Sequence, residues 1–370
     1  MIEENFRKNL SKLRPYKPGK SEEEIKKEYG ITEIIKLGSN ENPYGCSEKV
    51  KDILREEITT NIYPDNYAYY LRKKLSEKYK IGEENFIFGN GSVEILQMIC
   101  RIMLDTDDEV ITGKPTFQSY KSECIIQNAK IVEVPLKKHK FDLQGILEKI
   151  TEKTKIIFIC NPNNPTGTII TEEEQKEFLS KVPKNILVLL DEAYYEYVTS
   201  EEYPKSINML KEYENICILR TFSKAYGLAG LRIGYGIASK KIIEELEKVR
   251  VPFNISEITQ KSAYVALEDE EFIKKCNEKN NEVKEYIYEN LEKNNIEYIK
   301  TQANFIMINV QNDGVKIANK LLEKGIIVRP GFEDMGNFIR VTIGTKEEMQ
   351  IVLEELNKII KQEAIWKYYF

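Results

Sequence analysis

The sequence predicts an α/β protein with a large domain, built on a mainly parallel central sheet flanked by helices, and a smaller α+β domain. In the middle of the chain, short β-branched runs alternate with longer helical patterns, which is typical of βα units. Two of these runs, KIIFIC (155–160) and ILVLL (186–190), are apolar at consecutive positions, as in strands covered on both faces. The length of 370 residues favours two domains, because a single core rarely serves so long a chain.

The expected elements of the large domain are five strands and the helices between them. One helix is expected to begin at Thr171, where Glu174 offers a capping box. Another is expected to begin with Ser92 as the N-cap of the stretch VEILQMICRIML. The five strands are expected near Asn85–Phe88, Glu109–Thr112, Lys155–Cys160, Ile186–Leu190 and Ile216–Leu219.

The pattern changes after about residue 240, where the smaller domain is expected. A long charged helical region (266–294) precedes FIMINV (305–310), whose apolar residues are expected in the core. A helix, a second strand-like run and a final helix follow, which is an α+β arrangement. The resulting division is an N-terminal arm joining the small domain (1–40), a large domain (41–255) and a small C-terminal domain (256–370).

Composition and charge argue against several classes of function. The net charge of −5, with both signs interspersed, argues against nucleic acid or an anionic membrane as a partner. The polar N-terminus does not resemble a signal peptide, and the longest apolar runs are too short to cross a bilayer. Six cysteines without metal spacing indicate reduced thiols in a cytoplasmic protein. The single histidine, His139 in KKHK, is expected in a solvated loop, which disfavours histidine metal sites and Ser-His-Asp hydrolysis.

Polar clusters follow all five expected strands directly. In open α/β sheets, ligands bind outside the carboxyl ends of the strands. One such junction would be ordinary turn chemistry, but five at one edge of a sheet predict a composite site. The clusters are GNGS (89–92), KPTF (114–117), NPNNPTG (161–167), DEAYYEY (191–197) and RTFSK (220–224).

Two of these clusters suggest a phosphate site. GNGS at the start of a helix can present backbone N–H groups and the positive helix end to a phosphate. Alone, the same four residues would equally be a glycine turn with a serine cap, and they match neither GxGxxG nor a P-loop. The side chains of Thr221, Ser223 and Arg232 are candidates to clamp the same phosphate. Lys224 would then lie within reach of the molecule that carries it.

The remaining clusters fit one cofactor, pyridoxal 5′-phosphate. Lys224 would trap its aldehyde as a Schiff base, and the carboxylate of Asp191 would keep its ring nitrogen protonated. Phe117 is suited to cover one face of the ring. Asn164, before a Pro165 that we expect to be cis, would bond the ring hydroxyl together with Tyr194.

The order NPNNPTG, DEAY and SK-x(7)-R resembles the aspartate aminotransferase superfamily of fold type I. Further segments resemble the histidinol-phosphate aminotransferases, and the match runs over nearly the whole chain. These segments are RPYKPGK (14–20), KLGSNENPYG (36–45), NIYPDN (61–66), GNGS (89–92), DEAYYEY (191–197), RTFSKAYGLAGLRIGY (220–235), GIIVRPG (325–331) and FIRVTIGT (338–345).

The resemblance implies a role for each matching residue in holding the cofactor. Lys224 is implied as the Schiff-base lysine and proton shuttle, and Asp191 as the partner of the pyridine nitrogen. Asn164 and Tyr194 would bond the ring hydroxyl, while Phe117 would stack on the ring. The implied phosphate ligands are the backbone N–H groups of Gly91, Ser92 and Val93 and the side chains of Thr221, Ser223 and Arg232.

The resemblance also implies a substrate site and a homodimer. Tyr63 would reach the cofactor phosphate of the neighbouring subunit, so that two chains share their active sites. Arg340 would grip an α-carboxylate, a bidentate task suited to guanidinium, next to Asn164. Arg329 and Tyr16 would recognise the phosphate of the substrate. Without the resemblance, Arg329 and Arg340 could each be interpreted as an ion-pair partner of nearby surface glutamates.

Two positions depart from the family pattern. Val93 stands where the family often has an acidic or amide residue, so only its backbone N–H remains available to a phosphate. Phe117 stands where the family often has tyrosine, which keeps the stacking and loses the hydroxyl.

The function that the resemblance implies is transamination between L-histidinol phosphate and 2-oxoglutarate, with pyridoxal 5′-phosphate as cofactor, in histidine biosynthesis. An aminotransferase for aromatic or other amino acids and a threonine O-3-phosphate decarboxylase of the same superfamily are the alternatives. A regulatory module that binds the cofactor would need a DNA-binding domain, for which the residues before KLGSNENP leave no room. A nicotinamide dehydrogenase is disfavoured, because no glycine fingerprint follows the first strand.

Overall fold

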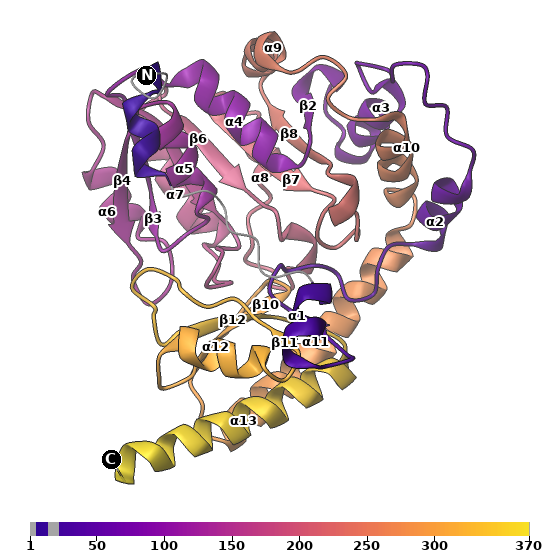
Figure 1. Cartoon of the computed structure of the whole chain (residues 1–370). Coiled ribbons are helices and arrows are strands. Elements are labelled where there is room, and N and C mark those ends of the chain that lie inside the picture. The colour runs from indigo at the N-terminus through magenta and orange to yellow at the C-terminus, as the bar shows by residue number, and fades with distance from the viewer. Residues whose placement is uncertain (1–4, 14–21, 370) are drawn as a thin grey trace.

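The computed structural model describes residues 5–13 and 22–369, and the side chains of residues 364–369 are not described. Its centre is a seven-stranded sheet with the strand order β2-β8-β7-β6-β5-β3-β4 (Figure 1). The strands β3 to β7 run parallel where they pair, and β8 is antiparallel to both of its neighbours. The strands are β2 (Phe86–Gly89), β3 (Glu109–Lys114), β4 (Lys130–Pro135), β5 (Thr154–Cys160), β6 (Leu187–Asp191), β7 (Ile216–Thr221) and β8 (Gly234–Ala238).

This sheet confirms the predicted fold class and all five expected strands. Because β2 and β7 are both antiparallel to β8, they point the same way, and the five polar clusters therefore share one edge. Sequence patterning missed two strands. The edge strand β4 is only half-buried along most of its length, and β8 contains two glycines. At Gly234 a Cβ would collide with the backbone N of Ser92, which explains a glycine inside a strand.

Of the two helix starts predicted for this part of the chain, one is confirmed and the other is displaced by one residue. Thr171 and Glu174 form the predicted capping box at the start of α7. The expectation that Ser92 caps α4 is wrong by one residue, because Gly91 is the N-cap and Ser92 already belongs to the helix. The helices are α2 (Glu48–Arg55), α3 (Tyr69–Tyr79), α4 (Ser92–Met103), α5 (Ser119–Ile126), α6 (Leu143–Glu148), α7 (Glu172–Lys181), α8 (Ser206–Met209), α9 (Lys240–Val249) and α10 (Glu257–Ala266), with short 3₁₀ turns η2 (Lys8–Lys12), η3 (Glu83–Asn85), η4 (Tyr195–Tyr197) and η5 (Ala229–Leu231).

A second layer of structure covers the carboxyl edge of the central sheet (Figure 1). It contains a three-stranded antiparallel sheet, with the order β12-β10-β9, and long helices that include α13 along the lower border of the view. The N-terminal strand β1 pairs in parallel with β11. The elements are α1 (Glu22–Tyr29), β1 (Ile35–Lys36), α11 (Glu270–Lys293), β9 (Tyr298–Ile299), β10 (Phe305–Asn309), α12 (Gly314–Leu322), β11 (Ile326–Ile327), β12 (Phe338–Thr342) and α13 (Lys346–Tyr369).

The buried side chains form two main apolar clusters. The larger cluster surrounds the central sheet, and the other joins Leu37 to residues 283–359. Within the described ranges, no helix combines the length and the apolar character needed to span a membrane. The domain boundaries at residues 40 and 255 stay a prediction.

Candidate active site

Lys224 lies just beyond the end of β7, at the edge where the polar clusters gather. Its Nζ donates a hydrogen bond to the carbonyl oxygen of Ser39, 3.0 Å away, and lies 5.8 Å from the centroid of the Tyr194 ring. Burial lowers the pKa of Lys224 to about 8, and the positive charges of Arg340 and Arg232 act in the same direction. An amine with this pKa is partly neutral near physiological pH, so it can act as a nucleophile and as a base.

Asp191, the last residue of β6, is a buried carboxylate with fixed neighbours. Oδ2 accepts a hydrogen bond from the hydroxyl of Tyr120 at 2.7 Å, and Oδ1 accepts one from the backbone N of Ala193 at 3.2 Å. Burial raises the pKa of Asp191 to about 6, against the lowering effect of these two bonds. Because burial destabilises the charged form of this carboxylate, a cationic N–H group beside it would be a favourable partner.

Tyr194 is held by a buried chain of polar groups. Its hydroxyl accepts a hydrogen bond from Asn40 Nδ2 at 2.9 Å. Asn40 is fixed in turn by Thr342 of β12, whose Oγ1 accepts from the backbone N of Asn40 at 2.9 Å and donates to its Oδ1 at 3.2 Å. Burial raises the pKa of Tyr194 to about 12, so its phenol stays protonated.

A group of polar donors beside the start of α4 can hold an anion. Gly91 adopts φ 79°, and a Cβ there would collide with Nη2 of Arg232, so this glycine lets the guanidinium approach the helix. Nη1 of Arg232 donates to the hydroxyl of Ser223 at 3.2 Å, and the backbone N of Ser223 donates to Thr221 Oγ1 at 3.0 Å. Ser92 and Val93 are the first two residues of α4, whose backbone N–H groups have no acceptor inside the helix. Guanidinium, hydroxyl and helix N-terminus together suit a phosphate.

The opposite side of the site carries a second guanidinium and an amide. The buried side chain of Arg340 donates through Nη1 to Asn164 Oδ1 at 2.6 Å and through Nη2 to the carbonyl oxygen of Gly38 at 2.8 Å. The Asn164–Pro165 bond is cis, as the sequence predicts. The Phe117 ring is half-buried and meets the Tyr120 ring edge-on, with 5.5 Å between their centroids. The site therefore combines an amine, a buried carboxylate, a phenol, an aromatic ring and two separate cations.

The other three predicted residues are not brought together with this group by any side-chain contact that the described residues show. Tyr63 is 78% exposed and stacks on the ring of Phe253, with 4.7 Å between the centroids. Arg329 pairs with Arg340 through backbone hydrogen bonds of 3.0 and 2.8 Å, which places it at the margin of the site. Tyr16 lies outside the described residues.

The structure adds two residues that the sequence did not reveal. Tyr120, in the first turn of α5, contacts Asp191, and only its place just after the KPTF cluster could have drawn attention to it. Asn40 contacts Tyr194 from a segment quoted only for its resemblance, and nothing in its sequence context indicates that contact.

An ion pair between Glu192 and Arg220 lies directly behind Asp191 in the core. Arg220 Nε and Nη2 donate to Glu192 Oε2 at 2.9 and 2.8 Å, and both side chains are at most 2% exposed. Arg220 also donates to the hydroxyl of Tyr79 at 3.0 Å and lies 3.6 Å from the centroid of the Tyr195 ring. The pair fixes the ends of β6 and β7, and hence the positions of Asp191 and Lys224.

We expect Glu192→Gln to destabilise the protein by about 3 kcal/mol, because it leaves the buried guanidinium without a compensating charge. Urea unfolding monitored by circular dichroism measures this loss. Glu214 pairs with Lys241 on the surface, so Glu214→Gln serves as the matched control, with an expected cost below about 1 kcal/mol. Equal stability of the two variants would show that the buried pair does not hold this region.

Comparisons with known proteins agree with this arrangement. The family model "Aminotransferase class I and II" matches residues 32–356. A histidinol-phosphate aminotransferase of Geobacillus sp. (strain WCH70) is 46% identical over 359 residues, covering 96% of this chain and 98% of that protein. The histidinol-phosphate aminotransferase of Bacillus subtilis (strain 168) is 45% identical over 359 residues, covering 96% of this chain and 99% of that protein.

A solved structure shows the same fold. The histidinol-phosphate aminotransferase of Sinorhizobium meliloti, crystallised in complex with pyridoxal-5′-phosphate, superposes with a TM-score of 0.88 at 25% identity. The match covers 96% of this chain and 98% of that chain. The resemblance inferred from the sequence is thereby confirmed. The chain belongs to the class I and II aminotransferase family, in the branch of the histidinol-phosphate aminotransferases.

Proposed function

We propose that this enzyme transfers the amino group between L-histidinol phosphate and 2-oxoglutarate, giving imidazole-acetol phosphate and L-glutamate. The observation that carries the proposal is the position of Lys224. Its amine, with a pKa of about 8, is influenced by the buried carboxylate of Asp191 and by two guanidinium groups on separate elements. This combination of groups fits a cofactor that carries a phosphate and reacts with the amine of Lys224, together with an anionic substrate.

The residues present fit pyridoxal 5′-phosphate. The region between Gly91 and Arg232, which a larger residue at 91 would fill, suits the phosphate, with Ser92, Val93, Thr221 and Ser223 contributing N–H and hydroxyl donors. Asp191 would pair with the ring nitrogen, and Asn164 and Tyr194 would bond the ring hydroxyl. Phe117 would cover one ring face. When bound, the cofactor supplies an electron sink for the electron pair left on the substrate Cα.

The chain's own residues would perform the binding and the proton transfers. Arg340 would exchange its present acceptors, Asn164 Oδ1 and the Gly38 carbonyl, for the α-carboxylate of glutamate, in line with the bidentate preference of guanidinium. Lys224 Nζ would take the proton from the substrate Cα and later return one, as a general base and then acid. Arg329 and Tyr16 would recognise the phosphate of histidinol phosphate.

The test is a steady-state assay with purified enzyme, pyridoxal 5′-phosphate, histidinol phosphate and 2-oxoglutarate. We expect stoichiometric formation of L-glutamate, with histidinol phosphate used at least about 100-fold more efficiently than phenylalanine, because a paired phosphate contributes a few kcal/mol. A preference for phenylalanine would replace this assignment by an aromatic aminotransferase. Release of carbon dioxide from O-phosphothreonine, without glutamate formation, would replace it by a decarboxylase.

Covalent attachment of the cofactor should depend on pH through Lys224. Its pKa is lowered from an ordinary value of 10.5 to about 8, so the reactive neutral amine becomes the major form above about pH 8. We expect the attachment rate of added pyridoxal 5′-phosphate to the cofactor-free protein to rise roughly tenfold per pH unit below pH 8 and to level off above it. Stopped-flow absorbance measures the rate. A rise that continues to pH 10 would contradict a lowered pKa.

We propose further that two chains form a homodimer in the cytoplasm. The stretch from the end of α2 to the start of α3 carries a band of exposed apolar side chains, and large exposed apolar patches mark interaction surfaces. Tyr63, which would reach the cofactor phosphate of the second chain, belongs to this band. The band comprises Leu54, Ile58, Ile62, Tyr63, Tyr67, Tyr69 and Tyr70, with Val251 and Phe253 also exposed.

We expect Ile62→Asp to weaken the dimer by about 100-fold, because it places an unpaired charge in the interface. Sedimentation velocity over a concentration series measures the change, with loss of activity in parallel. Ile351 on α13 is also exposed, and Ile351→Asp is the control that should remain dimeric. A wild-type protein that sediments as a monomer at all concentrations would refute the proposal.

A further inference from the structure

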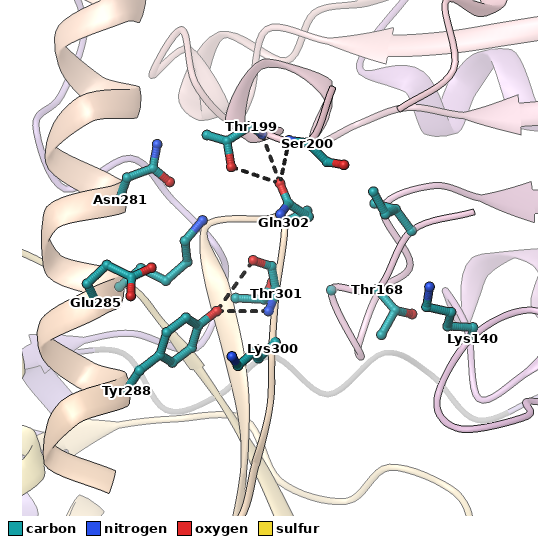
Figure 2. A pocket seen from close by; sticks show the side chains of 13 residues that line it. Lys140, Thr168, Thr199, Ser200, Asn281, Glu285, Tyr288, Lys300, Thr301 and Gln302 are labelled. Carbon is teal, nitrogen blue, oxygen red and sulfur yellow. Dashed lines mark hydrogen bonds between the residues drawn. The ribbon is translucent and has the colours of Figure 1, made fainter. Parts of the chain in front are cut away.

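A cavity of about 500 Å³ is lined by Gly167 and Thr168, which follow Asn164 in the loop after β5. Figure 2 shows Asn281, Glu285 and Tyr288 of α11 on one side of it and Thr168 and Lys140 on the other. The segment 300–302, which follows β9, lies between them. None of the lining residues belongs to the proposed active site.

The walls of this cavity are fixed by hydrogen bonds. Gln302 Oε1 accepts from the backbone N of Thr199 at 2.8 Å and of Ser200 at 3.3 Å, and the backbone N of Gln302 donates to the Gly167 carbonyl at 2.8 Å. The hydroxyl of Tyr288 accepts from the backbone N of Thr301 at 2.9 Å. These hydrogen bonds join the walls of the cavity to one another, and they occupy the polar atoms that take part in them.

Two other lining residues keep buried polar atoms that have no hydrogen-bond partner within the described part of the chain. They are Nζ of Lys284, whose side chain is buried, and Oδ1 of Asn281. Because these residues are three apart on α11, they face the same side of the helix. Leaving a buried charge and a buried amide oxygen unpaired is costly, so such a pair indicates a missing binding partner. Burial also lowers the pKa of Lys284 to about 8.

The charge of the lining indicates an anion. Lys140, Lys284 and Lys300 supply three amines, and Glu285 supplies the only carboxylate among the lining residues that the structure describes. The amine of Lys284 needs an acceptor, whereas Asn281 Oδ1 needs a donor. Hydrogen phosphate offers both, because its oxygens accept and its P–OH donates.

We propose that this cavity is a second anion site, which binds hydrogen phosphate between Lys284 and Asn281. Lys284 Nζ donates to the phosphate oxygens, and the P–OH donates to Asn281 Oδ1. Lys140 and Lys300, both exposed, close over the anion from the rim. The site is separate from the cofactor and substrate positions.

Equilibrium dialysis with radiolabelled inorganic phosphate tests this site. The parent protein is the Arg329→Ala variant loaded with cofactor. The bound cofactor occupies its own phosphate position, and the substitution weakens the proposed position for the phosphate of the substrate. We expect one saturable site per chain in this parent, at least tenfold weaker binding after Lys284→Met, and a severalfold loss after Asn281→Leu. Lys274→Met, at an exposed lysine of the same helix, should bind phosphate as the parent does.

Thermal unfolding gives an independent reading. Lys284→Met removes a buried charge, so without phosphate its melting temperature should exceed that of the parent. Added phosphate should raise the melting temperature of the parent and not that of Lys284→Met. The absence of saturable binding in the parent, or an unchanged isotherm in Lys284→Met, would overturn the proposal. Either failure would leave the transaminase assignment intact, because the steady-state assay tests that assignment separately.

Discussion

Lys224→Ala is expected to lower kcat for transamination by at least about 1,000-fold, because one amine both binds the cofactor and transfers the proton. Because the pKa of Lys224 is lowered to about 8, part of its amine is neutral near neutral pH and can accept a proton. Within the described residues, its amine donates a hydrogen bond only to the carbonyl oxygen of Ser39, so the fold should tolerate its removal. Single-turnover kinetics with histidinol phosphate measures the loss.

The matched control for this prediction is Lys224→Arg. Guanidinium keeps the positive charge but remains protonated at neutral pH, so it cannot serve as a base. We expect a loss similar to that of Lys224→Ala, with unchanged circular dichroism for both variants. Activity of Lys224→Arg near the wild-type level would show that the charge of Lys224, and not its proton transfer, matters.

Arg340→Ala is expected to lower kcat/KM for glutamate by about 100- to 1,000-fold, the effect of losing a charged, bidentate partner in a buried site. Its guanidinium is held by Asn164 and Gly38, which orients both Nη atoms before the substrate arrives. Most of the loss should appear in KM. Cofactor affinity should change little, since the residues proposed to hold the phosphate lie on β7, α4 and the loop before β8.

Arg340→Lys separates charge from geometry. A lysine amine preserves one positive charge but loses the paired N–H groups, so we expect an intermediate loss of about 10- to 100-fold. Steady-state kinetics with glutamate measures this loss, and histidinol phosphate, which has no carboxylate, is the comparison donor. A normal kcat/KM in Arg340→Ala would place the α-carboxylate elsewhere.

The sequence was most informative about the carboxyl edge of the central sheet. Runs such as KIIFIC are apolar on both faces, which identifies buried parallel strands, and the polar clusters that follow them lie at one edge as expected. Strand β8 was missed because it contains two glycines, which have a low strand propensity, and Gly234 is there for the close approach of the backbone at the start of α4. The local sequence pattern therefore predicts a strand less well where a contact with a distant segment determines which residues the strand contains.

The candidate site was predictable where its residues follow strands, and unpredictable where they arrive from distant segments. Lys224 and Asp191 each stand directly after or at the end of a strand. Asn40 reaches Tyr194 from 154 residues away, and only the folded chain brings the two together. The role of Tyr63 depends on a second chain, and Tyr16 lies outside the described residues. Both roles therefore rest on the resemblance.

The most direct test of the central claim is a titration of the cofactor-loaded enzyme with three amino donors, followed by the absorbance of the bound cofactor. Histidinol phosphate should convert the cofactor rapidly and saturably at concentrations where phenylalanine and O-phosphothreonine have little effect. That result would support both the transaminase chemistry and the phosphate-specific substrate site. If no cofactor absorbance develops on loading, the role of Lys224 and the whole account of the active site are contradicted.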